Sequence, residues 1–153
     1  MSLTIARALN QSGLLDSETA RLDVELLLCH VLQCERIYLR SWPEVTLDAE
    51  QSLFFDSLFK RRLKGEPIAH ILGSRSFWTL ELNVTSDTLI PRPDTETLVE
   101  HVLSLPLPED ACVLDLGTGT GAIALSLARE NPQWRVTATD VYPDVLVLAK
   151  ANA

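Results

Sequence analysis

The sequence predicts an all-α N-terminal bundle, a β-hairpin linker and then the start of an α/β domain of the Rossmann-like type. Three observations predict this order. Apolar residues recur with helical spacing in residues 1–66, two short β-prone runs follow in residues 67–93, and a strand, a glycine-rich turn and a helix come in succession within residues 94–153. We therefore expect the domain boundaries to fall after residues 66 and 93.

The composition is that of a soluble globular protein. The 153 residues are 46% hydrophobic and 22% charged, and no apolar run is long enough to span a membrane. A net charge of -8 opposes broad binding to nucleic-acid phosphates. The N-terminus has no export signal, and the cysteines lack the paired spacing of a disulfide framework or a zinc site. We expect a cytoplasmic monomer that binds no nucleic acid, membrane or metal.

Residues 1–66 carry the start signals of four helices. The expected starts are Ser2 or Thr4, then Asp16 or Ser17, then Glu35, and finally Asp48. Gln51 follows Asp48 at the spacing of a capping box. Gly65 and Pro67 end the fourth helix, because glycine suits the position after a helix and proline prevents continuation.

Charged residues on these helices are expected to face water. Arg21, Asp23 and Glu25 form the polar side of the second helix. The basic residues 60–62 lie in the last turn of the fourth helix, where cations complement the helix macrodipole. We interpret both groups as solvated surface rather than as a binding patch.

The segment after the bundle predicts a hairpin and a further helix. The runs 75–78 and 82–85 are β-prone and are separated by Thr79–Glu81. Pro93 is followed by acidic residues and then by apolar residues with helical spacing, which is typical of a helix start. Arg92 has either a structural role or a place in a ligand pocket.

A glycine-rich turn is the strongest functional signal. A short apolar run, read as a strand, stops at a loop with glycines at positions 117, 119 and 121, and an apolar helical pattern (Ile123, Leu127, Ala128) begins at once. Glycines permit positive φ and let a ligand approach the bare backbone beside the free N–H groups of a helix N-terminus. A second strand, Val136–Thr139, leads to Asp140, whose carboxylate can accept the ribose hydroxyls of a nucleoside.

Two classes of ligand fit this turn. Gly117, Gly119 and Ala122 match the G-x-G-x-x-G/A fingerprint of an NAD(P)-binding oxidoreductase. Asp115 favours the other class, because a carboxylate there would repel a pyrophosphate and attract the ammonium and sulfonium groups of S-adenosylmethionine (SAM). A third alternative is a catalytically inactive binding module built on the helical bundle.

Longer stretches resemble a known family. The segment Asp115–Ala124 is similar to motif I of SAM-dependent methyltransferases. Gly65–His70, Phe77–Trp78 and Leu89–Glu96 resemble the PrmC/HemK family, which methylates the N5 atom of a glutamine in peptide chain release factors during translation termination. The resemblance covers essentially the whole chain.

The resemblance implies a role for each part of the chain. SAM would be the methyl donor, and a release factor would be the protein substrate. The residues that would bind SAM are Gly117, Thr118, Gly119, Thr120, Gly121 and Asp140. Residues 1–66 would help to dock the release factor, residues 67–93 would be the hairpin linker, and residues 94–153 would be the first part of the SAM-binding methyltransferase domain.

The sequence departs from the family in one respect. The Asn-Pro-Pro-Tyr motif, which in that family holds the substrate glutamine amide, is absent from these 153 residues. The resemblance therefore assigns no catalytic residue here. It implies that the chain is the N-terminal portion of a longer enzyme with a truncated Rossmann-like domain, and we expect the chain alone to be inactive and to bind SAM weakly.

Overall fold

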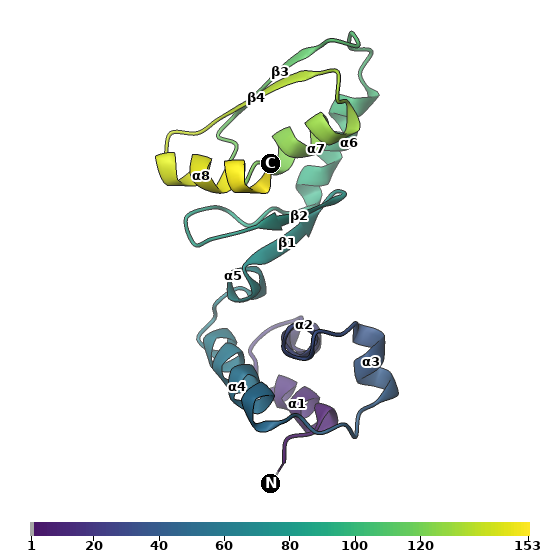
Figure 1. Cartoon of the computed structure of the whole chain (residues 1–153), viewed down its shortest axis with the longest axis vertical. Coiled ribbons are helices and arrows are strands. Elements are labelled where there is room, and N and C mark those ends of the chain that lie inside the picture. The colour runs from purple at the N-terminus through teal and green to yellow at the C-terminus, as the bar shows by residue number, and fades with distance from the viewer. Residues whose placement is uncertain (1) are drawn as a thin grey trace. The chain divides into compact units, whose positions relative to one another are not determined.

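The computed structural model describes residues 2–153 and divides the chain into two compact units, one ending at Leu72 and the other spanning Gly73–Ala153 (Figure 1). This division falls later than the expected boundary after residue 66. The reason is a short helix, α5 (Ile68–Leu72), which packs against other helices of the first unit. Residues 67–72 therefore belong to the helical unit rather than to the hairpin segment.

The first unit is built from helices around an apolar core. They are α1 (Ile5–Asn10), the 3-10 helix η1 (Gln11–Leu14), α2 (Ala20–Leu32), α3 (Arg36–Ser41), α4 (Ala49–Leu63) and α5. Ile5, Leu27 and Phe55 are fully buried, and the rings of Phe55 and Phe59 stack with centroids 5.7 Å apart. Burial of this apolar surface supplies the main driving force for folding of the unit.

Side chains determine where two of these helices begin. The capping box predicted at α4 is confirmed, because Asp48 Oδ1 accepts the Gln51 N–H at 2.8 Å and Gln51 Oε1 accepts the Asp48 N–H at 3.0 Å. The start expected for α2 at Asp16 or Ser17 was wrong. That helix begins at Ala20.

The hydroxyl groups before α2 explain its later start. Ser17 Oγ donates to Asp23 Oδ2 at 3.1 Å, and Thr19 Oγ1 donates to Asp23 Oδ1 at 2.9 Å. Ser17 Oγ also accepts the backbone N–H of Thr19 at 3.2 Å, and such a bond between side chain and backbone offers the chain a local alternative to another helical turn. The helix therefore starts after Thr19 instead of at Ser17.

The acidic residues of α2 are buried, contrary to the expectation that they face water. Asp23 and Glu25 are each 5% exposed. Arg62 Nε donates to Asp23 Oδ2 at 2.8 Å, and Arg36 Nε donates to Glu25 Oε2 at 2.8 Å. Burial raises the pKa of Glu25, but the hydrogen bonds from Arg36 and Arg21 and the charges of Arg36 and Arg40 outweigh it, and the pKa lies below its ordinary value. These ion pairs join α2 to α3 and α4.

The second unit contains a hairpin and a β-α-β unit. Its elements are β1 (Ser74–Phe77), β2 (Leu80–Asn83), the 3-10 helix η2 (Pro93–Thr95), α6 (Glu96–Ser104), β3 (Cys112–Leu116), α7 (Ala122–Glu130), β4 (Arg135–Thr139) and α8 (Pro143–Asn152). β3 and β4 pair in parallel, from Cys112 opposite Arg135 to Leu116 opposite Thr139. Their connection through α7 forms the strand, turn, helix and strand that the sequence predicts.

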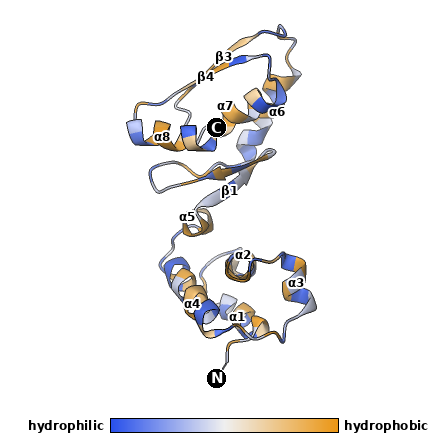
Figure 2. Cartoon of the chain, in the orientation of Figure 1, coloured by the Kyte–Doolittle hydropathy of each residue, from blue (hydrophilic) through white to orange (hydrophobic). Residues whose placement is uncertain are grey.

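The parallel sheet leaves apolar side chains in solvent. β3 carries mostly apolar colours in Figure 2, and its Leu114 and Leu116 are 59% and 74% exposed. Parallel strands are ordinarily covered on both faces, so this surface is unusual for such a sheet.

Within residues 2–153, no helix combines the length and the apolar character needed to cross a membrane.

The predicted hairpin is formed, with a shorter turn than expected. β1 and β2 are antiparallel, and only Trp78 and Thr79 lie between them. The Trp78 backbone N–H donates to Glu96 Oε1 at 2.9 Å, and its indole N–H donates to Glu130 Oε1 at 2.8 Å. These bonds attach the turn to the start of α6 and the end of α7. Glu96, whose role the sequence leaves open, therefore holds the hairpin turn.

Candidate functional site

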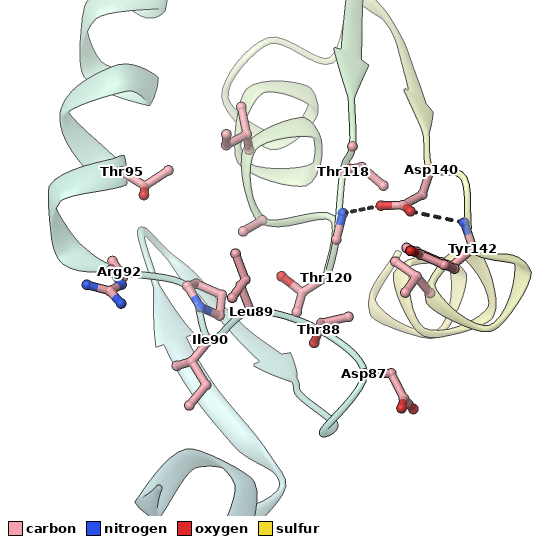
Figure 3. Close-up of a pocket in the computed structure, with 16 residues that line it drawn as sticks. Asp87, Thr88, Leu89, Ile90, Arg92, Thr95, Thr118, Thr120, Asp140 and Tyr142 are labelled. Atoms are coloured by element: carbon pink, nitrogen blue, oxygen red, sulfur yellow. Dashed lines mark hydrogen bonds between the residues drawn. The ribbon is translucent and has the colours of Figure 1, made fainter.

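A cavity of about 430 Å³ lies in the second unit between the glycine turn and the loop that precedes α6 (Figure 3). Its size falls in the ordinary range for small-molecule sites. The residues that line it are residues 87–92, Thr95, Gly117, Thr118, Gly119, Thr120, Ala122, Ile123, Asp140, Tyr142 and Val145. The ends of β3 and β4 place the turn and Asp140 at the same edge of the sheet.

Backbone geometry shapes the glycine turn. Gly117, Gly119 and Gly121 have φ of 74°, 56° and 85°. The N–H groups of Gly117 and Thr118 donate to the Thr139 carbonyl at 2.9 and 2.8 Å, and the Gly121 N–H donates to the Thr118 carbonyl at 2.9 Å. The turn is therefore held in place by its own backbone and by the end of β4.

Gly121→Ala is expected to destabilise the second unit by about 1–3 kcal/mol. An alanine resists the left-handed conformation, and its Cβ would lie 3.0 Å from Leu125 Cδ1. The matched control is Gly13→Ala, where φ is not positive and no atom lies within 4 Å of the added Cβ. Amide hydrogen exchange in α7, and in α2 for the control, measures each change. If Gly121→Ala lowers the stability of its unit no more than Gly13→Ala lowers that of the helical unit, the turn tolerates a side chain.

Asp140 reaches from the end of β4 to the glycine turn. Its carboxylate accepts the Gly119 N–H at 3.1 Å and the Tyr142 N–H at 3.2 Å, as the dashed lines of Figure 3 show. These backbone hydrogen bonds hold the pKa of Asp140 below its ordinary value. Because carboxylate oxygens have further lone pairs, the ionised group can also accept hydroxyls of a ligand.

Asp115 does not take the place that the sequence suggested. Its Oδ2 accepts the Thr118 hydroxyl at 2.7 Å, and the side chain is not among those that line the cavity. The charge argument that linked Asp115 to a cationic ligand is therefore not supported. The carboxylate stabilises the turn instead, because its bond with the Thr118 hydroxyl connects the end of β3 to the turn.

The structure separates the residues that the resemblance assigned to the cofactor. Gly117, Thr118, Gly119, Thr120 and Asp140 line the cavity. Gly121 does not line it, and its positive φ instead shapes the turn behind the cavity wall.

The loop before α6 supplies a wall that sequence reasoning missed. Residues 87–91 line the cavity together with Arg92, which the sequence leaves open between two roles. Figure 3 shows that Thr88, Leu89 and Thr120 face the same cavity. Leu89 is 91% exposed, so an apolar side chain at the cavity is open to solvent. The available signal was the Pro-Arg-Pro sequence, whose prolines hold the chain extended.

Metal ligands are not gathered at this cavity. Among residues 2–153, no group of three or more His, Cys, Asp or Glu side chains could hold a metal ion. The polar groups that the lining residues offer to a ligand are instead threonine hydroxyls, two carboxylates, the Arg92 guanidinium and those backbone groups of the turn that are not already hydrogen-bonded within the protein.

Comparison with known proteins covers both units. The PrmC N-terminal domain matches residues 4–73, and a methyltransferase domain matches residues 113–153. Release factor glutamine methyltransferases from three bacteria align with most of the chain. The identity is 55% over 136 residues for Shewanella oneidensis, 52% over 149 for Pseudomonas aeruginosa and 52% over 143 for Escherichia coli, which is 89%, 97% and 93% of this chain. The chain belongs to the PrmC/HemK family.

The family matches follow the division of the structure. The match to the PrmC N-terminal domain ends at residue 73, next to the division between Leu72 and Gly73. The methyltransferase match contains the glycine turn and Asp140 but not the loop 87–92. The chain spans about half the length of the curated relatives it matches, namely 48%, 54% and 51% for the three bacteria.

Proposed function

We propose that this chain provides the SAM-binding turn of an enzyme that methylates the N5 atom of a glutamine in peptide chain release factors. The observation that carries the proposal is the cavity that is lined by the glycine turn and Asp140 on one side and by the loop 87–92 on the other. The relatives are release factor glutamine methyltransferases, which supports the proposed reaction and substrate. The alternatives of an oxidoreductase and an inactive binding module have no such support.

The residues of the cavity fit the parts of SAM. The Asp140 carboxylate would accept the ribose hydroxyls, since it is ionised and already aligned by two backbone N–H groups. Leu89, Ile123 and Val145 offer apolar surface to the adenine ring. SAM, when bound, supplies an electrophilic methyl group. The cavity residues would hold it in a fixed orientation, and orientation is the main catalytic contribution available when the acceptor is a weakly nucleophilic amide.

The acidic lining disfavours a dinucleotide. Asp87 and Asp140 line the cavity with Arg92 as their one cationic counterpart among the lining residues. A pyrophosphate carries negative charge and would be repelled by the Asp87 carboxylate, whereas Asp140 suits the ribose of either ligand. SAM carries an ammonium and a sulfonium group, which the Asp87 carboxylate would attract.

The test is a methyl-transfer assay on a chimaera, in which this chain is followed by the part of the Escherichia coli relative that lies beyond the matched region. We expect the chimaera to transfer labelled methyl groups from SAM to a release factor glutamine and to bind SAM, but not NAD, in calorimetry. Deleting the helical unit should reduce transfer to the release factor without reducing SAM binding, as the proposed docking role requires. The Escherichia coli relative is the positive control. A folded chimaera that binds NAD and not SAM would refute the proposal.

A further inference from the structure

Asn152, in the last turn of α8, uses all the hydrogen-bonding capacity of its side-chain amide. Its Oδ1 accepts the backbone N–H of Asn83 at 2.8 Å and the side-chain N–H of Asn83 at 2.9 Å. Its Nδ2 donates to the carbonyls of Asn83 at 3.0 Å and of Thr120 at 2.9 Å. An asparagine amide offers two donor hydrogens and an oxygen with two lone pairs, so no further bond is available to it.

These bonds join three segments that are distant in the sequence. Asn83 ends β2, Thr120 belongs to the glycine turn, and Asn152 ends α8. Figure 1 shows the end of α8 beside β2 and α7, which agrees with the bonded groups. The hairpin and α8 are thus connected to the turn through one side chain.

The Thr120 carbonyl has a particular place in the turn. It belongs to the same planar peptide group as the Gly121 N–H, which donates to the Thr118 carbonyl at 2.9 Å. Asn152 therefore holds one end of this peptide group while the turn itself holds the other. A peptide group that precedes a glycine rotates easily, because glycine accepts both signs of φ. The bond from Asn152 opposes that rotation.

Asn152 acts on the cavity without lining it. Thr120 is 3% exposed and lines the cavity, as do Thr118 and Gly119 beside it. The N–H groups of Gly117, Thr118 and Gly119 are held by the end of β4, whereas the Thr120 carbonyl is held from α8. A change at Asn152 would therefore alter the turn and leave the bonds from β4 in place.

We propose that Asn152 is a positioning residue for the cofactor, which fixes the Thr120–Gly121 peptide group in the orientation that binds SAM. The inference rests on the proposed function, since it assumes that SAM occupies the cavity. A binding site gains affinity when its walls are fixed before the ligand arrives. A turn that samples both peptide orientations would bind only while it is in the competent one.

Three variants separate this role from general stability. Asn152→Ala removes all four bonds. Asn152→Asp keeps the shape and the acceptor oxygen that faces Asn83, but it loses both donors, including the one to Thr120. Asn83→Ala is the matched control, because it removes one side-chain bond and leaves the bond to Thr120 intact.

The first measurement is amide hydrogen exchange of Gly121 in this chain without ligand. Both Asn152 variants should exchange roughly three- to tenfold faster at Gly121 than the parent, and Asn83→Ala should not. Amides in the middle of α7 serve as the internal reference for global stability. Unchanged exchange at Gly121 in Asn152→Asp would overturn the inference, since the peptide group would then be held without Asn152.

The second measurement is the Kd for SAM in the chimaera. Both Asn152 variants should bind SAM roughly three- to tenfold more weakly, with KM for SAM raised and kcat at saturating SAM and KM for the release factor unchanged. If Asn152→Ala does not fold, Asn152→Asp decides. A parent that binds SAM and an Asn152→Asp variant that binds it equally well would overturn the inference alone. A parent that does not bind SAM would refute the proposed function and the inference with it.

Discussion

Asp140→Ala is expected to weaken the binding of SAM to the chimaera roughly 10- to 100-fold. The Asp140 carboxylate is an ionised acceptor that lines the cavity. Its orientation is already fixed, because the N–H groups of Gly119 and Tyr142 donate to it. Its removal takes away the acceptor for the ribose hydroxyls and also releases the Gly119 N–H. Isothermal calorimetry with SAM measures the loss.

Two further variants distinguish the loss of this particular acceptor from the loss of negative charge in general. Asp144→Ala removes the same charge from the first turn of α8, outside the residues that line the cavity, and should leave the Kd unchanged. Asp140→Asn keeps one acceptor oxygen for the turn and should bind SAM with intermediate affinity. Equal effects of Asp140→Ala and Asp144→Ala would show that only the net charge of the segment matters.

The pKa of Asp140 also fixes the expected pH dependence. Because backbone hydrogen bonds lower this pKa, the carboxylate is ionised throughout the range from about pH 5 to pH 8. The contribution of the ionised carboxylate to SAM binding is fully present above the ordinary pKa of an aspartate. It is lost only as the pH falls through the lowered pKa of Asp140. The affinity for SAM should therefore show no titration of Asp140 across that range.

Arg62→Met is expected to destabilise the helical unit by about 2–4 kcal/mol. It removes the cation that donates to Asp23 at 2.8 Å, and Asp23 is 5% exposed. The remaining partners, the hydroxyls of Ser17 and Thr19, do not neutralise the carboxylate. Amide hydrogen exchange in α2 reports this loss for the helical unit without assuming that the whole chain unfolds in one step.

Arg21→Met is the matched control for Arg62→Met. Arg21 lies on the same helix as Asp23 and contacts Glu25 at 3.4 Å, but its side chain is 56% exposed and Glu25 keeps the bond from Arg36. The loss should stay below about 1 kcal/mol. The double variant Asp23→Leu with Arg62→Met should recover much of the stability lost in Arg62→Met, because no buried charge remains unpaired. Similar losses for the two single arginine variants would contradict the assignment of a buried ion pair.

Local signals in the sequence determined most of the secondary structure. The capping box at Asp48 and Gln51 and the strand, turn, helix and strand around the glycines depend on residues that are close along the chain. Propensity, capping and periodicity act over that range. The position of Asp140 at the end of β4 followed from the same short-range pattern, and with it one side of the cavity.

Only the tertiary structure decided which polar groups are buried and paired. Asp23 meets Arg62 across 39 positions of the chain, and Asn152 meets Asn83 across 69. No periodicity encodes such pairs, because they depend on how whole elements pack. The opposite wall of the cavity, residues 87–92, is likewise an irregular loop whose place is set by its neighbours. Local spacing therefore determined where the elements begin and end, while packing at long range decided the ion pairs, the second wall of the cavity and the bond that holds the glycine turn.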